Sequence, residues 1–337
     1  MDRMPAVLLT ADRDIALVDH PMPARRADQV IVDVDLCGIC GSDLHAPELP
    51  QVYTGGVVMG HEATGTITWV GDRVPGWTIG QRVALNPNGN IDRTCPQCRA
   101  GRFNFCHRAT MQTALGLQAD GGLAPHVAVF PGVLRALPDS LDRTAAALVE
   151  PMATALHAAN LAGDLTDKTV LVTGGGTIGQ LALRISRARG AAQVLLVEPS
   201  QVRRAHGRGS GADAAWDADE AAGLVGDIGA DVVIEASGSG TASTLGLDAL
   251  DPGGVFVVVG AGPGTALDAA TILLKEISVH GSFTYVDEFD EAITALADGS
   301  LSVDGLAPAQ VPIRDALSAF EMLRDAAVLK VLVDPRA

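Results

Sequence analysis

The chain has 337 residues, 47% hydrophobic and 4% aromatic, so its cores must consist mainly of aliphatic side chains. Its formal net charge of −16 repels phosphate backbones and anionic bilayers, which argues against nucleic acid and membranes as partners. The first residues show no secretory signal, and no segment approaches the roughly 18 apolar residues that span a bilayer. All five cysteines lie between positions 37 and 106, a clustering that favours metal binding over a secreted disulfide framework. We therefore predict a cytoplasmic protein.

This length predicts two domains, each able to bury a core. About the first 150 residues are rich in Gly and Pro and contain short runs in which apolar and polar residues alternate. In VIVDVDL (30–36), Val32 and Val34 would share one face and Asp33 and Asp35 the other, as in a half-buried strand. We expect residues 1–153 to form a mostly antiparallel β domain with long loops.

Strands and helices alternate from about residue 151 onward. A buried strand, a glycine turn and an amphipathic helix follow one another in TVLVTGGGTIGQLALRISRARG (169–190), and three further apolar strands follow. This alternation predicts a parallel sheet with right-handed crossovers, a doubly wound α/β domain over 154–287. Residues 288–337 are helical and end in an apolar strand. They could extend this domain or return to the first, and we assign them to the first.

A glycine motif directly follows the first strand of the second domain. Gly174, Gly176 and Gly179 form G-x-G-x-x-G, whose glycines permit a tight turn, close approach of a pyrophosphate and packing of helix on strand. The N–H groups of the helix N-terminus would bind the phosphates. Glu198 ends the next strand, where a carboxylate accepts hydrogen bonds from the adenosine ribose and repels a 2′-phosphate, which favours NAD over NADP. Arg203 could weaken the preference for NAD if it bound a 2′-phosphate. The alternative interpretation of the motif is a structural turn followed by an incidental glutamate.

Three cysteines share one short loop, DRTCPQCRAGRFNFC (92–106). Cys95, Cys98 and Cys106 supply three thiolates of a closed tetrahedral zinc site, and Asp92 continues the spacing as a carboxylate ligand. An aspartate should bind the ion less tightly than a fourth cysteine. The alternative is a loop that has lost its metal and keeps three free thiols.

A second group of metal-binding residue types is dispersed along the chain. GHEATG supplies His61 and Glu62, VEPMAT supplies Glu150, and the pair Cys37 and Cys40 begins CGICGSDLH. A catalytic zinc needs about three protein ligands and an open position. Taken singly, each residue has an ordinary structural explanation, and C-x-x-C could equally be a redox pair, half a metal site or two unrelated thiols.

Seven segments occur in one order along nearly the whole chain. They are GICGSDLH, GHEATG, the cysteine loop, DGGLAPHV, VEPMATALHA, the glycine motif with Glu198, and KEISVHGSFTY. With these segments the sequence resembles a zinc-dependent medium-chain dehydrogenase/reductase, closest to the branch of sorbitol, butanediol and threonine dehydrogenases. The resemblance implies a GroES-like, mostly β catalytic domain followed by a Rossmann domain.

The resemblance implies a catalytic zinc held by Cys40, His61 and one carboxylate, either Glu62 or Glu150. Cys37 would then have no metal role, and Asp43 would orient His61. The loop at 92–106 would hold a structural zinc. Nicotinamide-cofactor contacts would come from Thr154, Gly174, Gly176, Thr177, Ile178, Gly179, Glu198, Arg203, Val259, Gly260, Ala261, Ser282, Phe283 and Thr284.

The implied reaction is hydride transfer between a secondary alcohol or ketone and NAD(H), with NADP less favoured. Ser42 would accept the hydroxyl proton and His45 would pass it to water. Polyol-acting relatives carry a tyrosine and an arginine where this sequence has Ala46 and Thr284, which weakens a long-polyol substrate and leaves a small diol, cyclitol or amino alcohol. The alternatives are an NADPH-dependent ketone reductase and a non-catalytic NAD or zinc sensor.

The resemblance also implies self-association. The family is often dimeric or tetrameric, so we expect a homodimer or homotetramer. The apolar strand VFVVVG (255–260) is our sequence-based candidate for pairing across a two-fold axis.

Overall fold

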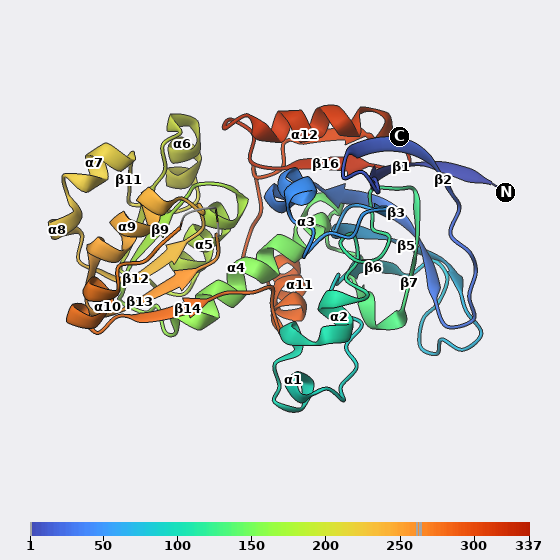
Figure 1. Cartoon of the computed structure of the whole chain (residues 1–337), viewed down its shortest axis with the longest axis horizontal. Coiled ribbons are helices and arrows are strands. Elements are labelled where there is room, and N and C mark those ends of the chain that lie inside the picture. Colours follow the sequence, from blue (N-terminus) through green and yellow to red (C-terminus); the bar gives the residue numbers. More distant parts are fainter. Residues whose placement is uncertain (1, 261, 263–264) are drawn as a thin grey trace. The chain divides into compact units, whose positions relative to one another are not determined.

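The computed structural model describes residues 2–260, 262 and 265–337. They form two compact units (Figure 1). The first unit contains 1–150, 289–297 and 303–337, and the second contains 151–288 and 298–302. The chain thus passes between the units within three residues of the divisions expected from sequence, and the short return of 298–302 to the second unit has no sequence signal.

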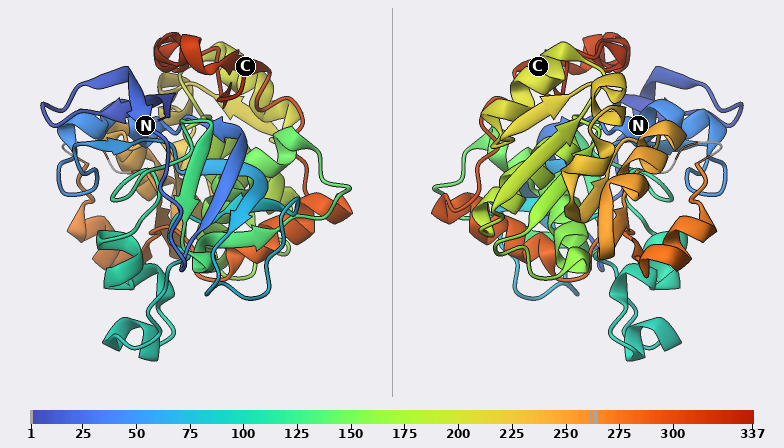
Figure 2. Two further views of the ribbon diagram at one scale, coloured as in Figure 1. Left: turned by 90° about the vertical axis from the view of Figure 1, so that its right-hand side faces the viewer. Right: turned by 90° about the vertical axis from the view of Figure 1, so that its left-hand side faces the viewer.

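The first unit is built on two sheets. One has three strands in the order β2-β1-β4, and the other has seven, in the order β15-β16-β3-β5-β6-β8 with β7 also paired to β3. All pairs are antiparallel except β15 with β16. The left view of Figure 2 faces these strands. The strands are β1 (Arg3–Leu9), β2 (Ile15–Pro21), β3 (Val30–Gly38), β4 (Val57–Val58), β5 (Glu62–Val70), β6 (Arg82–Leu85), β7 (His126–Val129), β8 (Leu134–Ala136), β15 (Ala309–Pro312) and β16 (Val331–Asp334).

Helices of the first unit are short. Those at 96–111 form a lobe that extends away from the sheets (Figure 1). They are the 3-10 helices η1 (Gly41–Glu48), η2 (Phe103–Phe105), η3 (Pro131–Val133) and η4 (Ile313–Asp315), and the α-helices α1 (Pro96–Arg99), α2 (His107–Met111), α3 (Arg143–Ala147), α11 (Glu288–Asp298, mostly in this unit) and α12 (Ala316–Arg324).

In strand β3, the alternation of apolar and polar residues places one set of side chains in the core of the first unit. Val32 and Val34 are fully buried and Asp33 and Asp35 half-buried, as the alternation predicts. Ile31, on the aspartate face, is buried as well, so the alternation is incomplete at the start of this central strand, which pairs with β5 and β7. The core around this strand is almost entirely aliphatic, in keeping with the low aromatic content.

The second unit is a six-stranded parallel sheet in the order β11-β10-β9-β12-β13-β14. In chain order this is 3-2-1-4-5-6, the doubly wound arrangement of dinucleotide-binding domains. The right view of Figure 2 shows its strands with helices beside them. Its elements are α4 (Val149–Ala162), β9 (Thr169–Thr173), α5 (Thr177–Ala188), β10 (Gln193–Val197), α6 (Gln201–Gly209), β11 (Ala214–Trp216), α7 (Ala218–Ala222), α8 (Val225–Ile228), β12 (Ala230–Glu235), α9 (Gly240–Ala249), β13 (Leu250–Val258), α10 (Ala269–Lys275) and β14 (Ser278–Gly281).

The α/β fold class is therefore confirmed, and one detail is wrong. The run 255–260 cannot pair across a two-fold axis, because β13 is already hydrogen-bonded to β12 and β14. The free edges are β11 and β14. Sequence reasoning missed β14, a short strand whose four residues are all exposed.

A buried hydrogen bond holds the first helix of the second unit to the end of that unit's main segment. The Nδ1 of His157 lies 3.0 Å from Oε1 of Glu288, and both residues are only 7% exposed. Asn160 donates to the same oxygen and the Val286 N–H to the other. Burial opposes ionisation, but the bonds from His157 and Asn160 outweigh it and lower the pKa of Glu288 to about 2.

We predict that Glu288→Gln lowers the free energy of unfolding by about 1–3 kcal/mol, the value of bonds to a buried charge. The pKa of Glu288 falls on folding. The carboxylate therefore contributes fully to the free energy of unfolding above pH 4.5, and this contribution is lost as the pH falls toward 2. Denaturant unfolding from pH 3 to 7 should therefore show a smaller difference between variant and wild type at the acid end. Glu276→Gln, an exposed carboxylate of the same unit, is the control. A pH-independent difference would contradict the assignment.

Candidate metal and cofactor sites

Strand pairing in the first unit brings Cys40, His61 and Glu62 together. Cys40 lies two residues beyond β3, and Glu62 begins β5, where it pairs with Gly38. One ligand atom of each of the three lies within 4.8 Å of the others. Gly38 is required here, because a Cβ at that position would lie 2.0 Å from Oε2 of Glu62. Thiolate, imidazole and carboxylate are the donors of catalytic zinc sites, so the set fits that ion.

Asp43 connects two of these residues. It is fully buried in η1, its Oδ2 accepts from the Cys40 N–H at 2.9 Å, and its Oδ1 lies 3.4 Å from Nδ1 of His61. Burial lowers the pKa of His61, but the Asp43 carboxylate outweighs this and raises it well above the usual value. With Nδ1 facing Asp43, Nε2 is the His61 atom left for a metal.

Sequence reasoning missed a buried cation in this cluster. Lys330 is 2% exposed, and its Nζ lies 2.7 Å from both oxygens of Glu62 and 3.0 Å from the carbonyl of Ile39. Burial lowers the pKa of Lys330, yet Glu62 and the other anions of the cluster outweigh this and raise it. The sequence does contain a sign of this buried cation, because a lysine interrupts the apolar run VLKVLV. An unpaired charge buried in such a run would be destabilising.

Glu150, the other carboxylate expected from sequence, lies in the first turn of α4 and is half-buried. It is not part of the close group of Cys40, His61 and Glu62 among the described residues. Burial raises the pKa of Glu150 to about 7, and the neighbouring charge of Glu62 adds to that rise. Glu150 therefore lies near the cluster but outside the set of close donors.

Ser42 and His45, the expected proton-transfer residues, are both exposed on η1. Ser42 Oγ lies 2.8 Å from the hydroxyl of Tyr53, a buried tyrosine that sequence reasoning did not single out. His45 Nδ1 lies 3.2 Å from Oε2 of Glu48. Cys37, by contrast, is fully buried in the core and belongs to neither metal-binding group of the described residues.

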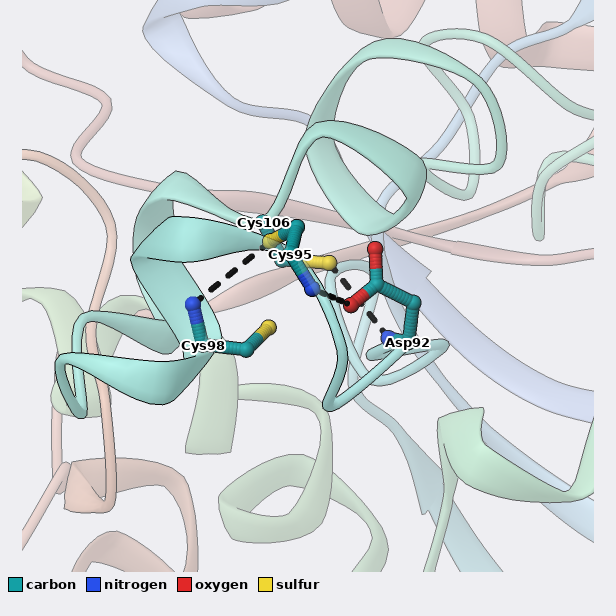
Figure 3. Close-up of side chains that lie close together, drawn as sticks. All are labelled: Asp92, Cys95, Cys98 and Cys106. Carbon is teal, nitrogen blue, oxygen red and sulfur yellow. Dashed lines mark hydrogen bonds between the residues drawn. The ribbon is translucent and has the colours of Figure 1, made fainter.

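The second group lies in the lobe at 92–106. Figure 3 shows the side chains of Asp92, Cys95, Cys98 and Cys106 gathered at one place. Their ligand atoms lie within 4.8 Å of one another. Asp92 Oδ1 accepts from the N–H groups of Thr94 and Cys95, at 2.6 and 2.8 Å. A carboxylate has about four lone-pair sites, so these bonds leave it able to bind an ion.

Electrostatics in the lobe also suit a cation. The backbone N–H groups of Cys95 and Thr94 lower the pKa of Asp92, so it is a carboxylate at neutral pH. Burial and hydrogen bonding to the other thiols raise the pKa of Cys98 to about 12, while the Cys98 N–H lowers that of Cys95. Thiols packed this closely bind a metal as thiolates, so three cysteines and one aspartate fit a closed zinc site.

The glycine motif forms the expected turn between β9 and α5. Gly174 has φ +96°, and a Cβ there would lie 2.7 Å from the Ser237 nitrogen. A Cβ at Gly179 would lie 1.8 Å from the Gly174 carbonyl oxygen, so no larger residue fits there. Around Gly176, the N-cap of α5, a Cβ would meet no atom within 4 Å. This open helix N-terminus suits a pyrophosphate.

Glu198 lies beside this turn. Its Oε2 accepts from the Gly175 N–H at 2.6 Å and its Oε1 from the Ser200 N–H at 2.8 Å. Arg203 is close to the glycine turn and to Glu198, since a Cβ on Gly175 would lie 3.3 Å from the Cβ of Arg203. The carboxylate is thus held by backbone, with lone pairs remaining for a ribose hydroxyl.

The remaining cofactor residues expected from sequence also lie in the second unit. Val259 and Gly260 follow β13 and donate to the Glu235 carbonyl. Ser282 and Thr284 follow β14, and their buried hydroxyl oxygens have no partner among the described residues, as expected of groups that meet a ligand. The others are Thr154 in α4, half-buried; Thr177 and Ile178, which begin α5; Phe283, exposed; and Ala261, which lies outside the described residues.

Comparison with known proteins agrees with this arrangement. Residues 26–139 match the family description "Alcohol dehydrogenase GroES-like domain" and 177–298 match "Zinc-binding dehydrogenase". The chain is 32% identical over 332 residues to D-xylulose reductase A of Aspergillus oryzae, covering 94% of this chain and 92% of the relative. It is 29% identical to sorbitol dehydrogenase of Bombyx mori, covering 97% of each.

A solved structure extends the likeness to three dimensions. A zinc-binding dehydrogenase from Sinorhizobium meliloti, crystallised with NADP, superposes with a TM-score of 0.92 at 31% identity, covering 99% of this chain and 100% of that one. Sequence and fold agree over nearly the whole length. The chain therefore belongs to the zinc-binding dehydrogenases of the alcohol dehydrogenase superfamily, oxidoreductases with a GroES-like domain and a Rossmann domain.

Proposed function

We propose that this protein interconverts a small secondary alcohol and its ketone with NAD(H) as hydride carrier. The proposal rests on the convergence of Cys40, His61 and Glu62 in front of Asp43. A zinc ion bound there would supply a Lewis acid that makes a nearby alcohol hydroxyl easier to deprotonate.

Between the two carboxylates, we propose Glu62 as the ligand that accompanies Cys40 and His61, because its oxygen lies within the close group. Lys330 stays bonded to the same carboxylate and offsets part of the negative charge of the thiolate and carboxylate. Glu150 would contribute charge nearby. Asp43 would hold the imidazole of His61 in one orientation and tautomer.

We assign proton transfer to two residues of η1, Ser42 and His45. Ser42 is exposed beside the cluster, and its oxygen can accept a hydrogen from the substrate hydroxyl. His45, on the same helix and exposed, would pass the proton to water. Its ordinary pKa near 6.5 suits that task.

The substrate class rests on the relatives and on two positions. Relatives named for xylulose and sorbitol favour a compound with neighbouring hydroxyls. By the family resemblance, Ala46 and Thr284 stand where polyol-acting members carry a tyrosine and an arginine, so we propose a smaller secondary alcohol, a diol, a cyclitol or an amino alcohol. A panel of these alcohols, assayed by NADH appearance, tests the assignment.

We propose NAD as cofactor because Glu198 would repel a 2′-phosphate. The NADP-bound relative favours a second candidate, an NADPH-dependent ketone reductase, with Arg203 as the residue available to a 2′-phosphate.

We further propose a homodimer or homotetramer in the cytoplasm. The free edge β14, with the adjacent Leu273 and Leu274 at 76% and 81% exposure, is the surface best suited to self-association. No helix in the described part of the chain is both long and apolar enough to cross a membrane.

Cys40→Ser should remove about one of two bound zinc ions per chain and abolish turnover, because a serine hydroxyl is a poor zinc ligand at neutral pH. Metal content by atomic emission and NADH formation provide the readouts. Cys37→Ala, the other cysteine of C-x-x-C, is the matched control and should keep both ions and the activity. Full activity in Cys40→Ser would refute the catalytic site.

Asp92→Asn should keep the bonds to the Thr94 and Cys95 N–H groups, since the amide oxygen still accepts, yet release zinc from the lobe about tenfold faster under chelator. Asp92→Cys should retain zinc longer than wild type. The measurement is zinc content against time of dialysis with EDTA. Equal retention in wild type and Asp92→Asn would exclude the carboxylate as a ligand.

Glu198→Ser should raise kcat/KM with NADP⁺ relative to NAD⁺ by about 10–100-fold, because it removes a ribose acceptor and a charge that repels the 2′-phosphate. Initial rates with both cofactors provide the test, with Glu276→Gln as a surface control in the same unit. A wild-type preference for NADP⁺ would instead support the ketone reductase.

A further inference from the structure

Tyr53 places a hydroxyl behind the exposed Ser42. The tyrosine is 1% exposed, and its oxygen lies 2.8 Å from Ser42 Oγ and 3.2 Å from Oδ1 of Asp43. Asp43 in turn faces His61. One phenol therefore connects the residue assigned to proton transfer with the residue that orients a metal ligand.

The backbone around Tyr53 is fixed from two sides. Arg13, itself at φ 68°, donates from its guanidinium to the carbonyls of Tyr53 (3.0 Å), Pro47 (2.7 Å) and Ala46. On the other side the Gln118 amide donates to the carbonyl of Val52. Arg13 thus ties the end of η1 to the backbone of Tyr53.

The number of hydrogens that each group can donate determines the direction of the bonds from Tyr53 to Asp43 and Ser42. A carboxylate only accepts, so the single hydroxyl hydrogen of Tyr53 goes to Asp43. The phenol oxygen can then only accept from Ser42, so the Ser42 hydrogen points inward to Tyr53. Both lone pairs of Ser42 Oγ remain for a hydrogen-bond donor on the exposed side. When Ser42 takes the substrate proton, its own hydrogen would leave the bond to Tyr53 and pass outward to water by way of His45, so that the serine ends the step neutral.

We propose that Tyr53 is a positioning residue that orients Ser42 as a hydrogen-bond acceptor for the substrate hydroxyl. The inference rests on the proposed function, because it assigns Ser42 to proton transfer. Burial keeps the phenol from touching substrate, so Tyr53 acts through Ser42. Without it, the serine hydroxyl rotates among several directions, and only some present a lone pair to the substrate.

A double-mutant cycle tests this. Ser42→Ala should lower kcat for alcohol oxidation by about 100-fold. Tyr53→Phe, which keeps the buried ring, should lower kcat by about tenfold, with KM for NAD⁺ and zinc content unchanged. In the Ser42→Ala background, Tyr53→Phe should have no further effect beyond about twofold, because its target is gone. Thr68→Val, which removes another hydroxyl bonded to an aspartate at 3.0 Å, is the control and should keep kcat.

The outcomes separate the two proposals. If Tyr53→Phe slows both backgrounds equally, or slows neither while Ser42→Ala is slow, the role of Tyr53 is wrong and the proton-transfer assignment stands. If Ser42→Ala keeps the wild-type rate, the assignment of Ser42 is wrong and the inference falls with it. Thermal melting of each variant distinguishes a loss of folding from a loss of orientation.

Discussion

The antiparallel pairing of β3 with β5 is the constraint from which the candidate site around Cys40 follows. Its last pair, Gly38 with Glu62, places the end of one strand beside the start of the other. The residues just beyond the two strand ends, Cys40 and His61, then lie close together although 20 residues separate them in the chain. Glycine at position 38 leaves the space that the Glu62 carboxylate occupies, since a Cβ there would lie 2.0 Å from Oε2 of Glu62.

A third strand completes the cluster. β16 pairs with β3 at Gly38 and Cys37, and Lys330 directly precedes it. This register delivers a buried ammonium to Glu62 from the far end of the sequence. Several buried anions without a cation would be unstable, because desolvation penalises each charge and the charges repel one another. The lysine compensates part of that cost, and a divalent ion held by the same carboxylate would compensate more.

The two candidate metal-binding groups differ in a way that would suit different roles. The lobe offers three sulfurs and one carboxylate, a complete tetrahedral set that leaves no position for substrate. The group around Cys40 offers three close donors and lies beside the exposed serine of η1, which leaves room for a fourth ligand. In the second unit the corresponding feature is the open helix N-terminus at Gly176, with Glu198 held by backbone N–H groups beside it.

The sequence by itself determined the local features: the alternating strand β3, the glycine turn before α5, the spacing of the cysteine loop and the parallel α/β pattern. Each depends on neighbours within about 20 residues, so periodicity and turn chemistry are sufficient to find it. Position by position, the family resemblance supplied the candidates at Cys40, His61 and Glu62.

Only the tertiary structure decided which distant residues act on these candidates. No local sequence pattern announces the three contacts that matter most, because each depends on strand register and loop packing. They are the bonds of Lys330 to Glu62, of Tyr53 to Ser42 and of Arg13 to the Tyr53 carbonyl. The same holds for the edge position of β14, which left the apolar run of β13 inside the sheet. Hydrophobicity identifies a strand but does not determine its place among its neighbours, since central and edge strands differ in what pairs with them rather than in composition.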